Sequence, residues 1–103
     1  MRILLSCSGG MSSSLIAEAL SDEAKKRSVD LAVDATGSES VADDLDEKQY
    51  DAVLLAPQTV YRKDAIKAEA DSHHIPFLMI PRLMYSPLQA GKLLDLVNEK
   101  LGK

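Results

Sequence analysis

Residues 51–57 read D-A-V-L-L-A-P, an apolar run that follows one aspartate and ends at a proline. A strand that helices cover on both faces has this composition, because neither face meets water. We therefore expect a central parallel strand over Asp51–Ala56. The runs Arg2–Ser6 (R-I-L-L-S) and Pro76–Ile80 (P-F-L-M-I) predict further strands of this kind. In Val29–Ala35 (V-D-L-A-V-D-A), apolar and acidic residues alternate, which predicts a half-exposed edge strand.

Segments of helical period separate these strands. We expect a first helix over Ser12–Arg27, a short second helix that starts with a capping box of Ser40 and Asp43, and a third helix over about Thr59–His73. The residues that should form the apolar face of the first helix are Leu15, Ile16, Ala19, Leu20 and Ala24. Those expected to do so in the second helix are Val41, Ala42 and Leu45.

The last helix has the clearest start signal in the chain. In Ser86-Pro87-Leu88-Gln89, serine can accept a hydrogen bond as N-cap, and proline suits the first helical position. We expect this helix to bury Ala90, Leu93, Leu94, Val97 and Leu101.

Strict alternation of strands and helices predicts an α/β fold with an open four-stranded parallel sheet, order 2-1-3-4, and helices on both faces. The length suits one domain over residues 1–103. The strand order reverses between strands one and three, and ligands bind at the carboxyl ends of the strands that flank such a reversal. This predicts a crevice where Cys7 lies beside the Ala56-Pro57-Gln58 turn.

The composition argues against several classes of function. Twelve basic and sixteen acidic residues give a formal charge of −4, and no tryptophan is present, so we expect no nucleic-acid partner. No apolar run approaches the roughly 18–20 residues of a membrane span, and none resembles a signal peptide. We therefore expect a cytoplasmic protein with no direct membrane insertion. The single cysteine cannot form an internal disulfide.

The segment Cys7-Ser8-Gly9-Gly10-Met11-Ser12-Ser13-Ser14, between the first strand and the first helix, carries the chemistry. Its two glycines allow a tight turn, and the free N–H groups of the following helical turn favour an anion of the size of phosphate. A thiol that faces a helix N-terminus has a lowered pKa and is more fully ionised to the nucleophilic thiolate. The loop therefore predicts a cysteine that accepts and holds a phosphoryl group. A small buried cysteine without chemistry is the alternative on these residues alone.

Known phosphate motifs narrow this interpretation. The patterns GxxxxGK[ST] and GxGxxG are both absent. Cysteine phosphatases use C-x5-R, in which the arginine clamps the phosphate. Here Ser13 stands six residues after Cys7, and the loop contains no arginine. The loop thus favours passing a phosphoryl group on over hydrolysing it.

The loop is similar to the C-S-[AG]-G-M-S-[ST]-S segment of enzyme IIB components of bacterial phosphotransferase systems, in the lactose/cellobiose/chitobiose family. The chain length, the order of elements, the Ala56-Pro57-Gln58 turn and the region of Tyr85 agree with that family, so the resemblance spans the whole chain. It implies a fold that resembles low-molecular-weight tyrosine phosphatases. Gly9, where alanine is common, is a mild departure from the pattern.

The resemblance implies a phosphoryl carrier of sugar uptake. Cys7 would accept a phosphoryl group from a phosphohistidine of the IIA component and donate it to a sugar bound by the membrane IIC component. The residues that would bind the phosphate are Ser8, Gly9, Gly10, Met11, Ser12, Ser13 and Ser14, with Gln58 as an accessory residue. We expect a monomer, because that state suits two successive partners, and no cofactor or metal.

Two other functions remain open from the residues. A phosphatase or arsenate reductase of similar fold would need the missing arginine and a late carboxylate, which 81–87 (P-R-L-M-Y-S-P) lacks. A binding module for flavin or a phospho-ligand would need aromatic residues that are scarce here.

Several other groups of residues are expected to be structural or to form solvated surface. The acids in 43–47 should form a solvated helix face, and the adjacent histidines 73–74 point to different sides of a helix. Four apolar residues are expected in the core or crevice wall, or in a docking patch near the loop: Phe77, Met79, Leu83 and Met84. The cations expected near the carboxyl end or rim of the sheet are Arg2, Arg62, Lys63 and Arg82.

Overall fold

A computed structural model describes residues 1–8 and 11–102 and contains a four-stranded parallel sheet in the order β2-β1-β3-β4. The strands are β1 (Arg2–Cys7), β2 (Ala32–Gly37), β3 (Ala52–Leu55) and β4 (Phe77–Met79). The expected order 2-1-3-4 is therefore confirmed. In the register of the central pair, Ser6 lies beside Leu55, and on the other side of β1, Cys7 lies beside Gly37.

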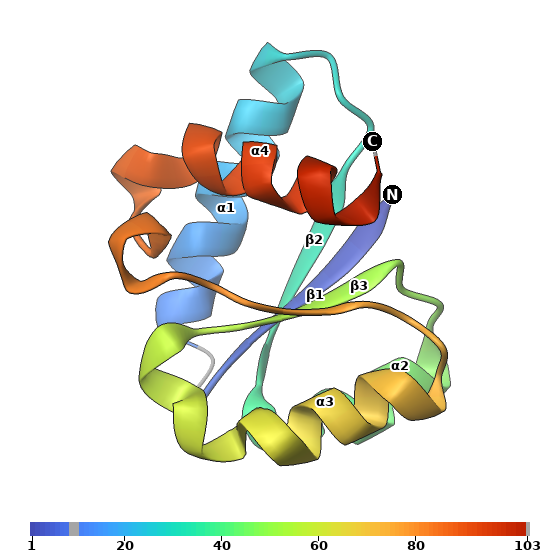
Figure 1. Cartoon of the computed structure of the whole chain (residues 1–103). Helices are drawn as coiled ribbons and strands as arrows, with labels where there is room; N and C mark the ends of the chain where they lie inside the picture. The colour runs from blue at the N-terminus through green and yellow to red at the C-terminus, as the bar shows by residue number, and fades with distance from the viewer. Residues whose placement is uncertain (9–10, 103) are drawn as a thin grey trace.

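Helices cover both faces of the sheet, as expected (Figure 1). Helices α1 and α4 lie on one face, and α2 and α3 lie on the other. Their bounds are α1 (Met11–Lys26), α2 (Val41–Glu47), α3 (Lys63–Ser72) and α4 (Ala90–Leu101). Short 3-10 turns join them: η1 (Ser38–Ser40), η2 (Pro57–Arg62), η3 (Arg82–Met84) and η4 (Pro87–Gln89).

The central strands supply both halves of the core, because successive side chains of a strand point to opposite faces. Ile3 and Leu5 of β1 pack in the cluster with α1 and α4, whereas Leu4 packs in the cluster with α2 and α3. In β3, Leu54 and Leu55 divide in the same way, and all of these side chains are at most 1% exposed. Burial on both faces explains why these strands are uninterrupted apolar runs.

Three local predictions were wrong or incomplete. Ser40 is the N-cap residue of α2 but its side chain makes no capping hydrogen bond, so there is no capping box. Leu15 is 62% exposed and does not belong to the buried face of α1. The segment expected as one helix over Thr59–His73 is divided into η2, which ends at Arg62, and α3; the backbone angles of both Thr59 and Arg62 depart from α-helical values.

Ser86 acts as an N-cap, as expected, but the element that it caps is the short turn η4, which precedes the last helix. The Oγ of Ser86 accepts a hydrogen bond from the N–H of Leu88 at 3.3 Å, and α4 follows from Ala90. Four of its five expected core residues are buried, and Leu101 is partly buried against them. Within the part of the chain that the structure describes, no helix has the length and apolarity that crossing a membrane requires.

Candidate functional site

Cys7 is the last residue of β1, and its side chain is 2% exposed. Its thiol donates a hydrogen bond to the Oγ of Ser13 at 3.3 Å. Ser13 lies in the first turn of α1 and is fully buried. Two residues six positions apart in the chain therefore lie within hydrogen-bond distance of each other. This arrangement places the only thiol of the sequence at the N-terminal end of α1, where backbone N–H groups favour an anion.

Three hydrogen bonds tie the base of this loop to β3 and η2. The Oγ of Ser6 donates to the carbonyl oxygen of Leu54 at 3.0 Å, and the N–H of Ala56 donates to the carbonyl oxygen of Ser6 at 2.8 Å. The N–H of Ser8 donates to the Oγ1 of Thr59 at 3.1 Å. The expected closeness of the loop and the 56–58 turn is thus confirmed, and the contact runs through Thr59.

Thr59 is a site residue that the sequence analysis missed. It is fully buried, and it follows directly on the expected Pro57-Gln58 turn. The only signal in the sequence was a polar residue next to that turn, which is common in solvent-exposed segments.

For the other residues of the predicted phosphate loop, the structure describes some completely, some only in their backbone and some not at all. Ser8 is exposed directly after the strand, and Ser14 is exposed in α1. Met11 and Ser12 open α1, while their side chains, like the whole of Gly9 and Gly10, lie outside the described residues.

Gln58 is exposed in η2, one residue before Thr59. Its side chain makes no hydrogen bond among the described residues, so it stands at the surface beside the loop instead of in the network that holds it.

Large exposed apolar side chains lie in the segments that follow the carboxyl ends of β1, β3 and β4. These side chains are Leu15 of α1, Val60 and Tyr61 of η2, Leu83 of η3 and Leu88 of η4, and each is at least 58% exposed. We call this set the apolar rim. Figure 1 shows these segments together at the left of the molecule, where β1 enters the loop. The rim therefore lies at the end of the sheet that carries Cys7.

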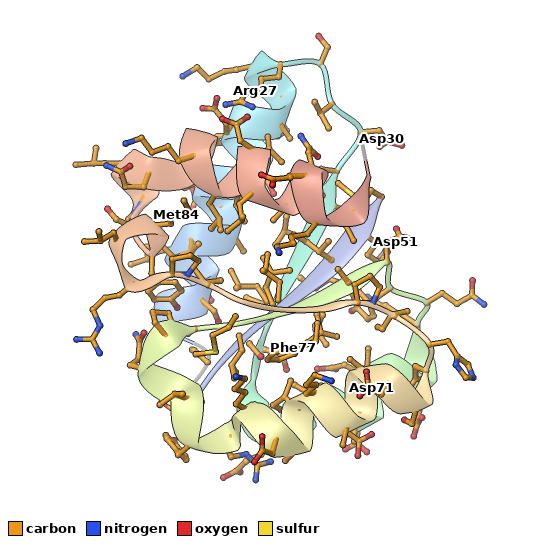
Figure 2. All side chains as sticks on the ribbon, in the orientation of Figure 1. Arg27, Asp30, Asp51, Asp71, Phe77 and Met84 are labelled. Carbon is orange, nitrogen blue, oxygen red and sulfur yellow. The ribbon has the colours of Figure 1, made fainter. Side chains whose placement is uncertain are left out.

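The four apolar residues expected in the core or in a docking patch are divided between these two environments. Phe77 and Met79 pack against the α2/α3 cluster and Met84 against the α1/α4 cluster, as Figure 2 shows for Phe77 and Met84. Leu83 is 88% exposed and belongs to the apolar rim.

The predicted cations also separate. Arg62, Lys63 and Arg82 lie in or directly after η2 and η3, at the carboxyl end of the sheet. The Nε of Arg62 is buried and has no hydrogen-bond partner among residues 1–8 and 11–102. Arg2 was placed wrongly, because it opens β1 at the opposite end and forms an ion pair with Asp34 at 3.3 Å.

Two polar networks lie away from the loop. The hydroxyl of Tyr50 donates to Asp34 at 2.7 Å, which lowers the pKa of Asp34, while burial raises the pKa of Tyr50. At the end of α3, the ring of His73 contacts the carbonyl oxygen of Glu69 and a carboxylate oxygen of Asp46, each at 3.0 Å, and both contacts raise the pKa of His73.

The acidic residues of α2 are only partly the solvated face that was expected. Asp43, Asp46 and Glu47 are exposed, whereas Asp44 is partly buried, with one carboxylate oxygen that lacks a partner among the described residues. In the same residues, no three His, Cys, Asp or Glu side chains form a group that could hold a metal ion.

The sequence matches known proteins along most of its length. The profile of the family described as "PTS system, Lactose/Cellobiose specific IIB subunit" matches residues 2–85. The "PTS system oligo-beta-mannoside-specific EIIB component" of Bacillus subtilis (strain 168) is 32% identical over 91 residues, which cover 88% of this chain and 86% of that protein.

Two solved structures share the fold. The lactose-specific IIB component domain from Streptococcus pneumoniae superimposes with a TM-score of 0.84, with 23% identity, over 96% of this chain and 95% of that chain. The cellobiose-specific IIB component protein from Borrelia burgdorferi superimposes with a TM-score of 0.77, with 27% identity, over 99% of this chain and 92% of that chain. These domains have the phosphatase-like architecture that the loop resemblance implied.

Proposed function

The chain belongs to the lactose/cellobiose-specific IIB family of the sugar phosphotransferase system, and from this membership we propose that Cys7 is its phosphoryl carrier. The observation that carries the proposal is the position of Cys7, at the end of β1 and 3.3 Å from the hydroxyl of Ser13 in the first turn of α1. A thiolate at this position faces the positive end of the helix dipole, which also favours the phosphoryl group that it would carry.

The proposed reaction has two transfers. In the first, the Cys7 thiolate attacks the phosphorus of a phosphohistidine on the IIA component, in line with the P–N bond. The S–P bond forms as the P–N bond breaks, and the imidazole leaves. In the second, a sugar hydroxyl bound by the IIC component attacks the phosphorus: the O–P bond forms as the S–P bond breaks, and the proton lost by the hydroxyl leaves Cys7 as the thiol. The free N–H groups of the first turn of α1 stabilise the charge on the phosphoryl oxygens.

Ser13 distinguishes this proposal from hydrolysis. It occupies the position of the phosphatase arginine, and it is fully buried against Cys7. Without a guanidinium to clamp the phosphoryl oxygens, a water molecule gains less help in attacking the S–P bond. The cysteinyl phosphate is then kept for the sugar.

The apolar rim supports a role in successive protein contacts. Both transfers require a partner to reach Cys7, so we propose that IIA and IIC use the same end of the sheet, one after the other. Tyr61 and Leu83 are 72% and 88% exposed there, and Gln58 is exposed beside them. A single domain over residues 1–103 that acts as a monomer on the cytoplasmic side of the membrane suits this exchange of partners.

Intact-mass spectrometry at neutral pH tests the proposal. The protein is incubated with phosphoenolpyruvate, the general phosphotransferase proteins and a panel of IIA components for lactose, cellobiose, chitobiose and oligo-β-mannosides. We expect a gain of one phosphoryl group that Cys7→Ser abolishes and that excess unphosphorylated IIA reverses.

Absence of transfer from every IIA component, together with turnover of a chromogenic phosphate ester or reduction of arsenate by Cys7, would overturn the proposal. The phosphatase or arsenate reductase interpretation would then replace it. Ser72→Ala is the matched control, since it removes an exposed hydroxyl at the far end of α3.

A further inference from the structure

Thr59 holds the first backbone amide after the nucleophile. Its Oγ1 accepts the N–H of Ser8 at 3.1 Å, and Ser8 directly follows Cys7 in the chain. The N–H of Thr59 in turn donates to the carbonyl oxygen of Ala56 at 3.0 Å, which anchors the residue to the end of β3. The start of the loop is therefore connected to the central strand through one threonine hydroxyl.

The orientation of Thr59 is the reverse of the usual one for a surface turn. Thr59 is fully buried, while the apolar side chains that follow it, Val60 and Tyr61, are 58% and 72% exposed. A buried hydroxyl is unfavourable unless it is hydrogen-bonded, so packing alone would favour the opposite arrangement. The non-helical angles of Thr59 (φ −102°, ψ 26°) interrupt η2 at this residue. The local backbone thus departs from helical geometry where the hydroxyl meets the amide of Ser8.

We propose that Thr59 is a positioning residue for phosphoryl transfer at Cys7. The inference rests on the proposed function and adds a residue to it. By fixing the peptide that leaves Cys7, the Thr59 hydroxyl sets the direction of the loop relative to the sulfur. Reactions that depend on in-line geometry are sensitive to small displacements of this kind. Thr59 acts through Ser8 and forms no bond with the phosphoryl group.

Two substitutions separate the hydroxyl from the packing of the side chain. Thr59→Val keeps the branched shape and removes the acceptor, whereas Thr59→Ser keeps the acceptor and removes a methyl group. We expect Thr59→Val to lower the first-order rate of phosphoryl acceptance from saturating phospho-IIA about 3- to 10-fold, the range that one lost hydrogen bond supports. Thr59→Ser should restore most of that rate.

Val97→Ala is the control for stability. It removes volume from the core cluster between α4 and the sheet, at a side chain that is 1% exposed and forms none of the hydrogen bonds of the loop described above. We expect it to lower the melting temperature without changing the rate of acceptance. A merely structural role of Thr59 would instead make Thr59→Val and Val97→Ala alike once both are compared at equal stability.

The amide of Ser8 gives a second readout that needs no phosphoryl transfer. In the wild-type protein its hydrogen exchange should be slowed although Ser8 is exposed, and its NMR resonance should shift in Thr59→Val. Rapid exchange of this amide in the wild type would overturn the inference even if Thr59→Val fails to fold. Wild-type rates in Thr59→Val, or equal losses in Thr59→Val and Thr59→Ser, would also overturn it. Failure of the proposed function has a different signature, in which wild-type protein and Cys7→Ser behave alike toward phospho-IIA.

Discussion

The sulfur of Cys7 lies 3.3 Å from the hydroxyl oxygen of Ser13, six residues later in the chain and fully buried in α1. The first turn of α1 thereby contacts the proposed nucleophile. In the thiol form, sulfur donates to the hydroxyl, and in the thiolate form the hydroxyl can turn and donate to sulfur. One serine can therefore serve both protonation states of Cys7.

Ser13→Ala should slow phosphoryl acceptance by Cys7 about 10- to 100-fold, because hydrogen bonds to charged groups contribute more than neutral ones. Quenched-flow transfer from phospho-IIA measures the rate, and alkylation of Cys7 by iodoacetamide reports the thiol without a partner protein. Ser72→Ala should match the wild type in both assays. Unchanged rates in Ser13→Ala would show that the contact plays no part in the chemistry.

Replacement of Leu83 and Leu88 together by serine should weaken the encounter with phospho-IIA. These side chains are 88% and 93% exposed, so each change should alter the free energy of unfolding by less than about 0.5 kcal/mol. We expect a several-fold higher KM for phospho-IIA with little change in the rate at saturation. The control is the double substitution Ala65→Ser and Ala68→Ser, at exposed positions of α3. Equal KM values in the two double variants would show that Leu83 and Leu88 take no part in docking phospho-IIA.

Tyr50→Phe should reduce stability by about 1 kcal/mol at neutral pH, the contribution of one hydrogen bond to a partly exposed carboxylate. The Tyr50 hydroxyl, 2.7 Å from Asp34, holds the pKa of that carboxyl below its ordinary value. A lowered pKa stabilises the fold above the unfolded value of about 3.9, and this stabilisation is lost as the pH falls through the folded value. Urea titrations from pH 7 to pH 2.5 should therefore show a smaller difference between variant and wild type in acid. If the difference in stability between Tyr50→Phe and the wild type stays constant from pH 7 to pH 2.5, the effect of the substitution does not depend on the ionisation of Asp34.

Asp46→Asn should lower the pKa of His73 only part of the way to its ordinary value near 6.5. The contact with the carbonyl oxygen of Glu69 is the larger cause of the raised pKa, and it remains when Asp46 loses its charge. A raised pKa stabilises the fold below the unfolded value and the benefit disappears as the pH rises through the folded value. NMR titration of the His73 ring measures this change in pKa. The control is Glu47→Gln, at an exposed position of α2, the helix that carries Asp46. An unchanged titration in Asp46→Asn would contradict the contact.

The strands and their order could be predicted because each depends on which faces of a segment meet water. The apolar run in 51–56 needed cover on both sides, and the alternation in 29–35 needed an edge, so the order 2-1-3-4 followed from connection rules. The ends of the elements were less predictable. Leu15 fits the helical period but is 62% exposed, and a period cannot show where the cover of neighbouring elements ends.

The chemistry of the site divides in the same way. Cys7, the glycines and the serines of its loop lie within eight consecutive residues, so a local pattern was enough to propose a phosphate loop. Thr59 is 51 residues away from Ser8 in the chain, and it meets the loop only because β1 and β3 are neighbours in the sheet. No local pattern distinguishes that threonine from a solvated one. The sequence by itself therefore determined the sheet, the proposed nucleophile and the family. Only the tertiary structure decided which distant side chain holds the loop and which apolar residues surround it, because contacts between distant segments exist only once the sheet has formed.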